Sequence, residues 1–371
     1  MEIDIAQSIT VRHCSIYDMP RAGINIGDGA FGGHLVEFCD VFDTVKETSD
    51  HGSFNSWGRD RFWAPKITEI NARVQAAPEL PLLDAVKPNT LRNSRWRCDH
   101  GWDIDLDDGS SNYVIENNLC LFSGIKNREG YHRTVQNNIM VNNSFHPHCW
   151  LASSGDTFRR NIMFGSYRPR GGMPTTPWGL ELDYNLVHQP GLAEVKPATE
   201  LQALSGRDAH SVVGDAAFIN PAAGDFRVKD GSPALALGFK NFPMDQFGVQ
   251  KPALKAVART PSFGVGKAAA QRDATPKTWL AARVRNLIDQ GEMSAYGTPG
   301  VTGVLVLDVP AGSAMAAAGL RKDDVILFLN GKPTDELGQL LRLSAGLKAG
   351  AVVKIGILRN QKALTLNLTS K

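Results

Sequence analysis

The chain has 371 residues, more than one ordinary domain needs, and this length predicts two folded units. Hydrophobic residues make up 42% and charged residues 21%, and these ordinary values exclude a chain that is disordered throughout. The 40 Lys and Arg against 38 Asp and Glu leave a net charge of +2, too balanced for a protein whose main partner is nucleic acid. No apolar run reaches the roughly 20 residues that cross a bilayer, so we expect no membrane span.

The beginning of the chain lacks the features of an export signal. Residues 1–5 have neither the basic nor the apolar region of a signal peptide, yet strand-like sequence starts at Ser8. A fragment and a mature form lacking upstream coils both fit this pattern. The five cysteines are too sparse, and odd in number, for a disulfide framework, so we expect most of them to be small buried residues.

A short pattern recurs along the first 190 residues: an apolar residue, two residues, Asn or Cys, one residue, and a second apolar residue. The central positions of the clear copies are Cys14, Cys39, Asn118, Asn138, Asn161 and Asn185. A degenerate copy around Asn93 leaves room for a long insertion from about Trp57 to Pro88. Repeats of this length with short strands predict a right-handed parallel β-helix in which the Asn side chains form a ladder. A leucine-rich repeat is disfavoured because its fixed Leu positions are missing.

Residues 8–250 resemble the pectate-lyase-like β-helix proteins that act on polysaccharides. The tail 225–228 followed by 231–235 (Asp-Phe-Arg-Val, then Gly-Ser-Pro-Ala-Leu) is similar to the closing coils of that superfamily. We therefore expect a mostly β protein, with the β-helix over residues 1–250.

Two stretches, 50–63 and 99–109, are too polar and aromatic for plain coils. In the second, alternation places Ile104 and Leu106 in the core, and Asp103, Asp105 and Asp107 on the outer face. Three aligned carboxylates repel one another, so at least one pKa rises or a cation binds. The set suits a general acid paired with a base or nucleophile, a calcium site, or simply a solvated acidic strand.

The next coil supplies complementary charge. Aligning Gly130 with Gly109 stacks Lys126 over Asp105, Arg128 over Asp107 and Glu129 over Asp108. These contacts are either structural salt bridges or part of a catalytic constellation. The coil after it adds His146 and His148 on one face, whereas Cys149 points to the opposite face, which disfavours a dedicated zinc site. Five of the seven tryptophans lie within residues 57–150. Sugar rings stack on such aromatic side chains, so this enrichment fits a carbohydrate-binding groove.

The candidate substrate-binding residues are the polar and aromatic side chains of these coils. They are His51, Trp57, Arg59, Asp60, His100, Trp102, Lys126, Arg128, His148 and Trp150.

Two enzyme resemblances bear on the chemistry. Residues 107–112, 128–130 and 135–138 resemble the active-site coils of β-helix alginate and chondroitin lyases, where a Lys base and an Arg acid sit on successive coils. Arg128 matches that Arg, but Asp108 stands where the Lys is expected, which disfavours β-elimination. Residues 104–112 and 124–130 are also similar to glycoside hydrolase family 141, β-helix enzymes acting on fucosides or xylan, which implies hydrolysis by two acidic residues.

The candidate catalytic residues are Asp105, Asp107 and Asp108, with Asp60 in reserve. Asp105 or Asp107, beside Lys126 and Arg128, is expected to stay ionised as base or nucleophile. Asp108, beside Glu129, is the better general acid.

The last part of the chain has a different pattern. Residues 251–276 are rich in Ala, Lys, Pro and Gly and are expected to be a linker. Residues 277–371 resemble a PDZ domain of the bacterial protease type, a small α+β unit that binds a peptide as an added strand. The resemblance implies that Trp279, Leu280, Ala281 and Ala282 hold the peptide's carboxylate, with the helix near 336–343 as the other wall. Ala281 replaces the usual Gly.

The sequence therefore predicts a polysaccharide-directed glycoside hydrolase with a peptide-binding PDZ module, located in the periplasm or outside the cell. Calcium is a possible cofactor, and no other is implied. A calcium-assisted β-helix lyase and a non-catalytic carbohydrate-binding or adhesin protein are the alternatives.

Overall fold

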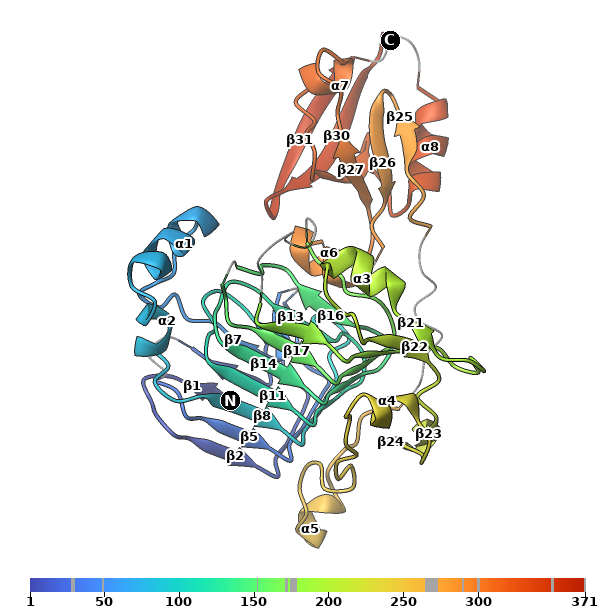
Figure 1. The fold of residues 1–371 in the computed structure, drawn as a ribbon. Helices are drawn as coiled ribbons and strands as arrows, with labels where there is room; N and C mark the ends of the chain where they lie inside the picture. The colour runs from blue at the N-terminus through green and yellow to red at the C-terminus, as the bar shows by residue number, and fades with distance from the viewer. Residues whose placement is uncertain are drawn as a thin grey trace. The chain divides into compact units, whose positions relative to one another are not determined.

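Short parallel strands stack from coil to coil into three sheets (Figure 1). This computed structural model describes residues 1–27, 31–48, 50–151, 153–170, 173, 179–263, 273–288, 290–298, 301–347 and 350–369. The chain divides into two units, Met1–Lys267 and Ala268–Lys371. The predicted mostly β class, a parallel β-helix followed by a small α+β unit, is confirmed.

The first sheet contains β1 (Glu2–Ile3), β4 (Ile24–Ile26), β7 (Gly52–Ser56), β10 (Trp102–Leu106), β13 (Ile125–Asn127) and β16 (Phe145–Pro147). The second contains β2 (Thr10–Arg12), β5 (Leu35–Glu37), β8 (Asn89–Arg92), β11 (Tyr113–Glu116), β14 (Arg133–Gln136), β17 (Thr157–Arg159) and β19 (Glu181–Asp183). The third contains β3 (Ser15–Ile16), β6 (Asp40–Val41), β9 (Arg95–Trp96), β12 (Leu119–Cys120), β15 (Ile139–Met140), β18 (Ile162–Met163), β20 (Leu186–His188), β22 (Val212–Gly214) and the antiparallel β21 (Lys196–Pro197).

The interior is built from columns of equivalent apolar side chains. The first sheet contributes Ile24, Phe54, Ile104, Ile125 and Phe145. The second contributes Val11, Val36, Leu91, Ile115, Val135, Phe158 and Leu182. Because a one-residue slip would turn each column outward, this burial holds the coils in register.

The predicted ladder runs through Asn118, Asn138, Asn161 and Asn185. Each backbone N–H donates to the side-chain oxygen of the next Asn at 3.0 Å. The copy assigned to Asn93 is wrong by one residue, because Ser94 occupies the ladder position and its N–H donates to Asn118 Oδ1 at 3.2 Å. Asn93 instead adopts the left-handed conformation just before the ladder, with φ of 48°.

The insertion between β7 and β8 folds into α1 (Ile67–Ala76) and α2 (Leu80–Leu83). Its Phe62 and Ile70 form a small separate core with Tyr131 and Leu151 of later coils. The insertion is therefore fastened beside the coils that carry the polar cluster. All five cysteines lie in the described part of the chain and are free, and Cys39, Cys98 and Cys120 are buried as expected.

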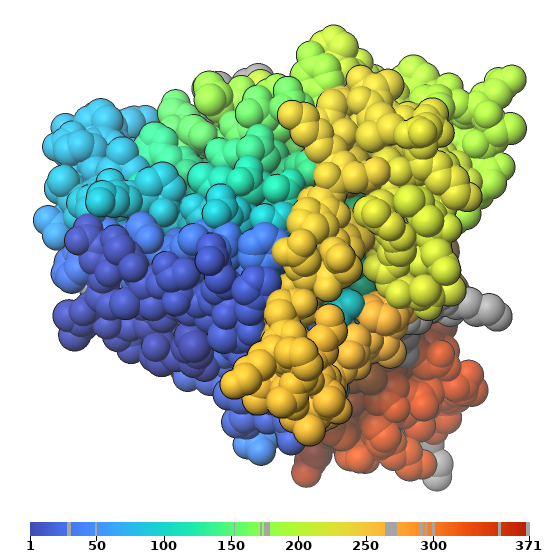
Figure 2. Space-filling view, turned by 90° about the horizontal axis from the view of Figure 1, so that it is seen from below, coloured from blue at the N-terminus to red at the C-terminus, as the bar shows by residue number. Residues whose placement is uncertain are grey.

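Helix α3 (Thr199–Ser205) follows the last coils and buries Leu201 in the interior core of the solenoid. The segment after it covers the outer side of the third sheet and contains β23 (Phe218–Asn220), the 3-10 helix η1 (Pro221–Ala223), β24 (Asp225–Val228), α4 (Pro233–Ala236) and α5 (Pro252–Lys255). Phe226, Phe239 and Phe247 bury the outward-facing Leu119 and Ile139. Figure 2 shows this segment, yellow to gold, as a band across the coils.

The band continues past residue 250. Arg259 binds Asp43 at 2.9 Å, and Arg97 donates to Ser262 Oγ at 2.9 Å, so the residues up to Phe263 contact the β-helix. The boundaries 1–250, 251–276 and 277–371 remain predictions.

In its described residues, the second unit is an antiparallel sheet with three helices. It contains β25 (Lys277–Trp279), β26 (Ala282–Asn286), α6 (Gln290–Tyr296), β27 (Val304–Asp308), α7 (Ala314–Ala317), β28 (Val325–Leu329), β29 (Lys332–Pro333), α8 (Leu337–Ala345), β30 (Val352–Arg359) and β31 (Lys362–Thr369). The strand order is β25-β26-β27-β28-β30-β31, with β29 paired to β28. Among the described residues, no helix is long and apolar enough to cross a membrane.

Replacing Asn138 by Ala should lower the free energy of unfolding by about 3 kcal/mol, because the buried Asn118 N–H and Ile115 carbonyl lose their partners. Gln136→Ala, on the half-buried outer side of β14, is the matched control and should cost less than about 1 kcal/mol. Urea denaturation followed by circular dichroism measures both. Equal losses would contradict a structural role for the ladder.

Candidate functional site

Two rows of polar side chains run along the outer face of the first sheet. The first row is Glu2, Asn25, Asn55, Asp105, Lys126 and His146, which are register partners from coil to coil. The second row contains Trp57, Asp107, Arg128 and His148, each two residues after a member of the first row in the last four of these coils. The predicted stacking of Lys126 over Asp105 is confirmed.

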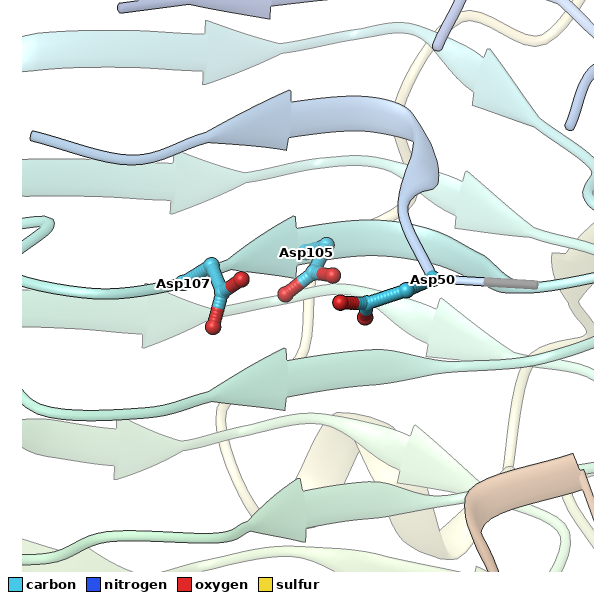
Figure 3. A group of neighbouring side chains, drawn as sticks. All are labelled: Asp50, Asp105 and Asp107. Atoms are coloured by element: carbon cyan, nitrogen blue, oxygen red, sulfur yellow. The ribbon is translucent and has the colours of Figure 1, made fainter. Parts of the chain in front are cut away.

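Lys126 binds two of the predicted carboxylates. Its Nζ lies 2.8 Å from Asp105 Oδ1 and 3.5 Å from Asp107 Oδ1, while Arg128 Nη1 lies 3.1 Å from the same Asp107 oxygen. Asp50, just before β7, completes the cluster: one oxygen from each of Asp50, Asp105 and Asp107 lies within 4.8 Å of the others. Figure 3 shows the three carboxylates gathered on one side of the strand.

Asp50 was missed as a site residue because the long insertion and loop lengths hide which coil residue meets β10. The available signal was its place directly before the polar strand β7. Asp103, in contrast, does not join the cluster, and the expectation that it shares the outer face with Asp105 and Asp107 is wrong. Its carboxylate is fully buried and accepts backbone N–H bonds from Cys98, Phe122, Ser123 and Gly124. Its role is to hold two turns together.

The environments of Asp105 and Asp107 shift their pKa values in opposite directions. Burial raises the pKa of Asp105 well above its usual value, and the Lys126 ammonium opposes that rise. Burial also raises the pKa of Asp107, but Lys126 and Arg128 outweigh it, so the net pKa is lowered. The neighbouring carboxylates in turn raise the pKa of Lys126 despite its burial, so this side chain stays charged.

Asp108 lies at the edge of the same cluster, between two guanidinium groups. Arg128 Nη1 is 3.1 Å from its Oδ1 and Arg59 Nη2 is 3.3 Å from its Oδ2. Burial, together with the negative charges of Asp107 and Glu129, raises the pKa of Asp108. The direction matches the expectation for a general acid.

Aromatic rings flank this edge. The Arg59 guanidinium lies over the rings of Trp57 and Trp63, at 5.7 and 5.1 Å from their centroids. Arg59 is exposed and both tryptophans are half-buried, so ring surface remains accessible beside Asp108. Of the two tryptophans beside Asp108, Trp57 was predicted to bind substrate. Trp63 was noted in the same stretch of sequence but was not predicted to bind substrate.

Trp102 and Trp150 are wrongly placed by the sequence interpretation. Trp102 is 0% exposed and lies beneath the Lys126 ammonium, with the rings of His146 and His148 edge-on to it at 4.5 and 5.3 Å. Trp150 is 5% exposed and packs edge-on against Phe145 in the core. Neither ring has a face available for a sugar.

The remaining predicted residues lie at different depths. His148 is half-buried, and burial with the nearby Lys126 charge lowers its pKa well below the usual value, so it is neutral. His51 accepts a hydrogen bond from Arg21 Nε at 3.1 Å, and burial lowers its pKa. His100 is exposed, and Asp60 is half-buried in the loop after β7.

The cluster suits an ammonium better than calcium. Calcium requires six to eight oxygen ligands, and Asp50, Asp105 and Asp107 supply a partial set. Lys126 Nζ already lies within 3.5 Å of two of these carboxylates, and its positive charge repels a second cation there. These residues therefore do not fit a calcium ion.

In the second unit, the four residues predicted to form the carboxylate loop have a different local structure. Trp279 ends β25, Leu280 and Ala281 form a tight turn with φ of 46° and 77°, and Ala282 begins β26. The loop therefore contains two residues rather than four, since Trp279 pairs with Ala282. The helix expected near 336–343 is present as α8.

Comparison with known proteins identifies this second unit. Residues 278–369 match the family model described as PDZ domain. The chain is 40% identical over 67 residues to the periplasmic pH-dependent serine endoprotease DegQ of Escherichia coli (strain K12), covering 18% of this chain and 15% of that protein. It is 30% identical over 90 residues to a probable periplasmic serine endoprotease DegP-like of Rhizobium meliloti (strain 1021), covering 24% and 18%.

The chain thus spans less than a fifth of the length of these relatives, over the PDZ part alone. Among solved structures, the HtrA3 PDZ domain bound to a phage-derived ligand is 19% identical, with coverage of 26% of this chain and 86% of that chain and a TM-score of 0.21. The second unit is therefore a PDZ domain, a peptide-binding module, and the first is a β-solenoid.

Replacing Lys126 by Met should destabilise the protein by about 3–5 kcal/mol at neutral pH, because Asp105 is left buried without its cation. The folded-state pKa of Asp105 then lies further above its unfolded value. The native state binds more protons than the unfolded state, so stability falls as pH rises above about 4. Thermal denaturation between acidic and neutral pH measures this slope. In the double variant Lys126→Met/Asp105→Asn, most of this dependence of stability on pH should disappear. An equal slope in the single and double variants would contradict a buried pair of Lys126 and Asp105.

Proposed function

We propose that the solenoid unit is a polysaccharide-directed glycoside hydrolase whose working carboxyl groups are Asp107 and Asp108. The observation that supports this is a pair of adjacent carboxyl groups, bound to the same Arg128 nitrogen, whose pKa values shift in opposite directions. Glycoside hydrolysis needs one carboxylic acid and one carboxylate on either side of the bond that is cleaved. The proposal includes the resemblance of residues 104–112 and 124–130 to glycoside hydrolase family 141, which would imply the same chemistry.

Each carboxyl group then has a separate role. Asp108, with its raised pKa, donates its proton to the glycosidic oxygen as the bond to the anomeric carbon breaks. Asp107, with its lowered pKa, stays ionised and either attacks the anomeric carbon or accepts a proton from the attacking water. Arg128, which touches both groups, holds them in place.

Asp105 serves as a positioning residue in this scheme. It is fully buried, so it orients Lys126 toward Asp107 rather than touching the substrate. Trp57 and Trp63 provide ring surface for sugar stacking, and the exposed Arg59 suits a sugar hydroxyl or an acidic sugar.

We assign the PDZ domain to binding a protein partner through its peptide groove. The named relatives of this domain are periplasmic proteases, which agrees with a periplasmic or extracellular location. The similarity to these proteases covers the PDZ domain, so it gives no support for proteolytic activity in this chain.

The first test is a panel of plant and algal polysaccharides with detection of new reducing ends. Asp107→Asn and Asp108→Asn should each lower kcat/KM by about 10²–10⁴-fold, the usual contribution of an acid or base. Exposed Asp230→Asn is the matched control and should leave kcat/KM unchanged. Full activity in both site variants would sink the assignment.

The products and binding data separate the alternatives. Unsaturated uronates, lost with a chelator, would identify a calcium-assisted lyase instead. Glycan binding without turnover would identify a carbohydrate-binding protein.

The pH dependence provides a sharper test of the acid. Because the negative charge of Glu129 raises the pKa of Asp108, Glu129→Gln should move the alkaline limb of the kcat profile to lower pH. Because Arg59 lowers that pKa, Arg59→Gln should move the same limb to higher pH. Shifts of the same sign, or none, would remove Asp108 from the acid role while leaving Asp107 in place.

A further inference from the structure

The peptide groove of the PDZ domain lies between an edge strand and a helix. In this fold a peptide adds to the sheet as a further antiparallel strand, with its last side chain inserted toward the helix. The corresponding elements here are β26 and α8, whose Val284 and Leu340 share one apolar core. What lies along β26 therefore decides whether the groove is open.

The chain's own β25 occupies that edge of β26. It pairs antiparallel with β26, with Lys277 opposite Val284, Thr278 opposite Arg283 and Trp279 opposite Ala282. The other edge of β26 is paired with β27. Both edges are thus taken, and β25 forms the end of the sheet next to α8 (Figure 1).

Trp279 takes the place of a ligand's last side chain. It is 2% exposed, packs in the same core as Leu337 and Leu340 of α8, and donates from Nε1 to Ser344 Oγ at 2.6 Å. The Ser344 hydroxyl in turn donates to the Leu340 carbonyl at 2.7 Å. An indole fixed at both its apolar body and its N–H leaves no room for a second side chain.

The entry to β25 is anchored as well. Asn286, at the end of β26, donates from Nδ2 to the Asp273 carbonyl at 2.9 Å and accepts from the Leu337 N–H at 2.6 Å. One side chain thus joins the segment before β25 to the first turn of α8. At the other end, the Leu280-Ala281 turn continues the chain where a free peptide would present its carboxylate.

We propose that residues 277–279 are an internal ligand that closes the peptide groove, so that a protein C-terminus binds only after β25 leaves β26. The apparent affinity for a peptide is then reduced by the fraction of molecules in which the groove is open. Exposed Lys277 and Thr278 contribute little burial, so Trp279 is the main contact holding the segment.

The test uses the full chain and a pool of fluorescein-labelled peptides with free carboxyl termini ending in Val, Leu, Phe or Trp. Fluorescence anisotropy should show at least about tenfold tighter binding to Trp279→Ala than to the wild type, because the internal ligand is released. Ser344→Ala, which removes only the indole's hydrogen-bond partner, should show a smaller gain of the same sign. Phe328→Ala, an exposed aromatic on β28, is the control and should bind as the wild type does.

A disulfide that joins β25 to β26 and keeps the groove closed provides the opposite test. This test does not depend on how Trp279→Ala folds. Thr278 and Arg283 are exposed and directly opposite, so Thr278→Cys/Arg283→Cys places two thiols at disulfide distance. The oxidised variant should bind no peptide, and reductant should restore wild-type binding. Binding by the oxidised disulfide variant, equal binding by wild type and both opening variants, or no binding by any variant would each overturn the proposal.

Discussion

Everything in the solenoid depends on one constraint, the in-register stacking of its coils. Buried columns such as Phe54, Ile104 and Ile125 fix the register by their apolar contacts, and the Asn ladder fixes it again by hydrogen bonds. A slip by one residue would turn both sets to the wrong side. The same register places Lys126 over Asp105, so the electrostatics of the candidate site follow from the packing of the core.

The polar cluster is consequently mostly buried. Lys126 binds Asp105 and Asp107 of the preceding coil, and in the proposed mechanism Asp107 and Asp108, at the edge of the cluster, meet the substrate. The proposed mechanism thus separates the groups that hold charge in position from the groups that exchange protons. Opposite pKa shifts at adjacent carboxyl groups are the feature that relates this geometry to glycoside hydrolysis.

The PDZ domain illustrates a different use of strand pairing. Its fold receives ligands by adding a strand to an open edge, and here the chain supplies that strand itself. An internal ligand is present at a high effective concentration, so even a short segment such as residues 277–279 competes with a free peptide. Regulation of partner binding would then reside in the segment that leads into the domain.

The sequence by itself determined the coil repeat, the Asn ladder and the two-unit organisation, because each is a local pattern that repeats at constant spacing. It also predicted the pairing of Lys126 with Asp105, since equal coil lengths make register readable. Only the tertiary structure decided that Asp50 joins the cluster and that Asp103 leaves it, because turns of unequal length direct those side chains. The burial of Trp102 and the position of Trp279 beneath α8 were likewise decided by packing, which brings together residues that are distant in the sequence.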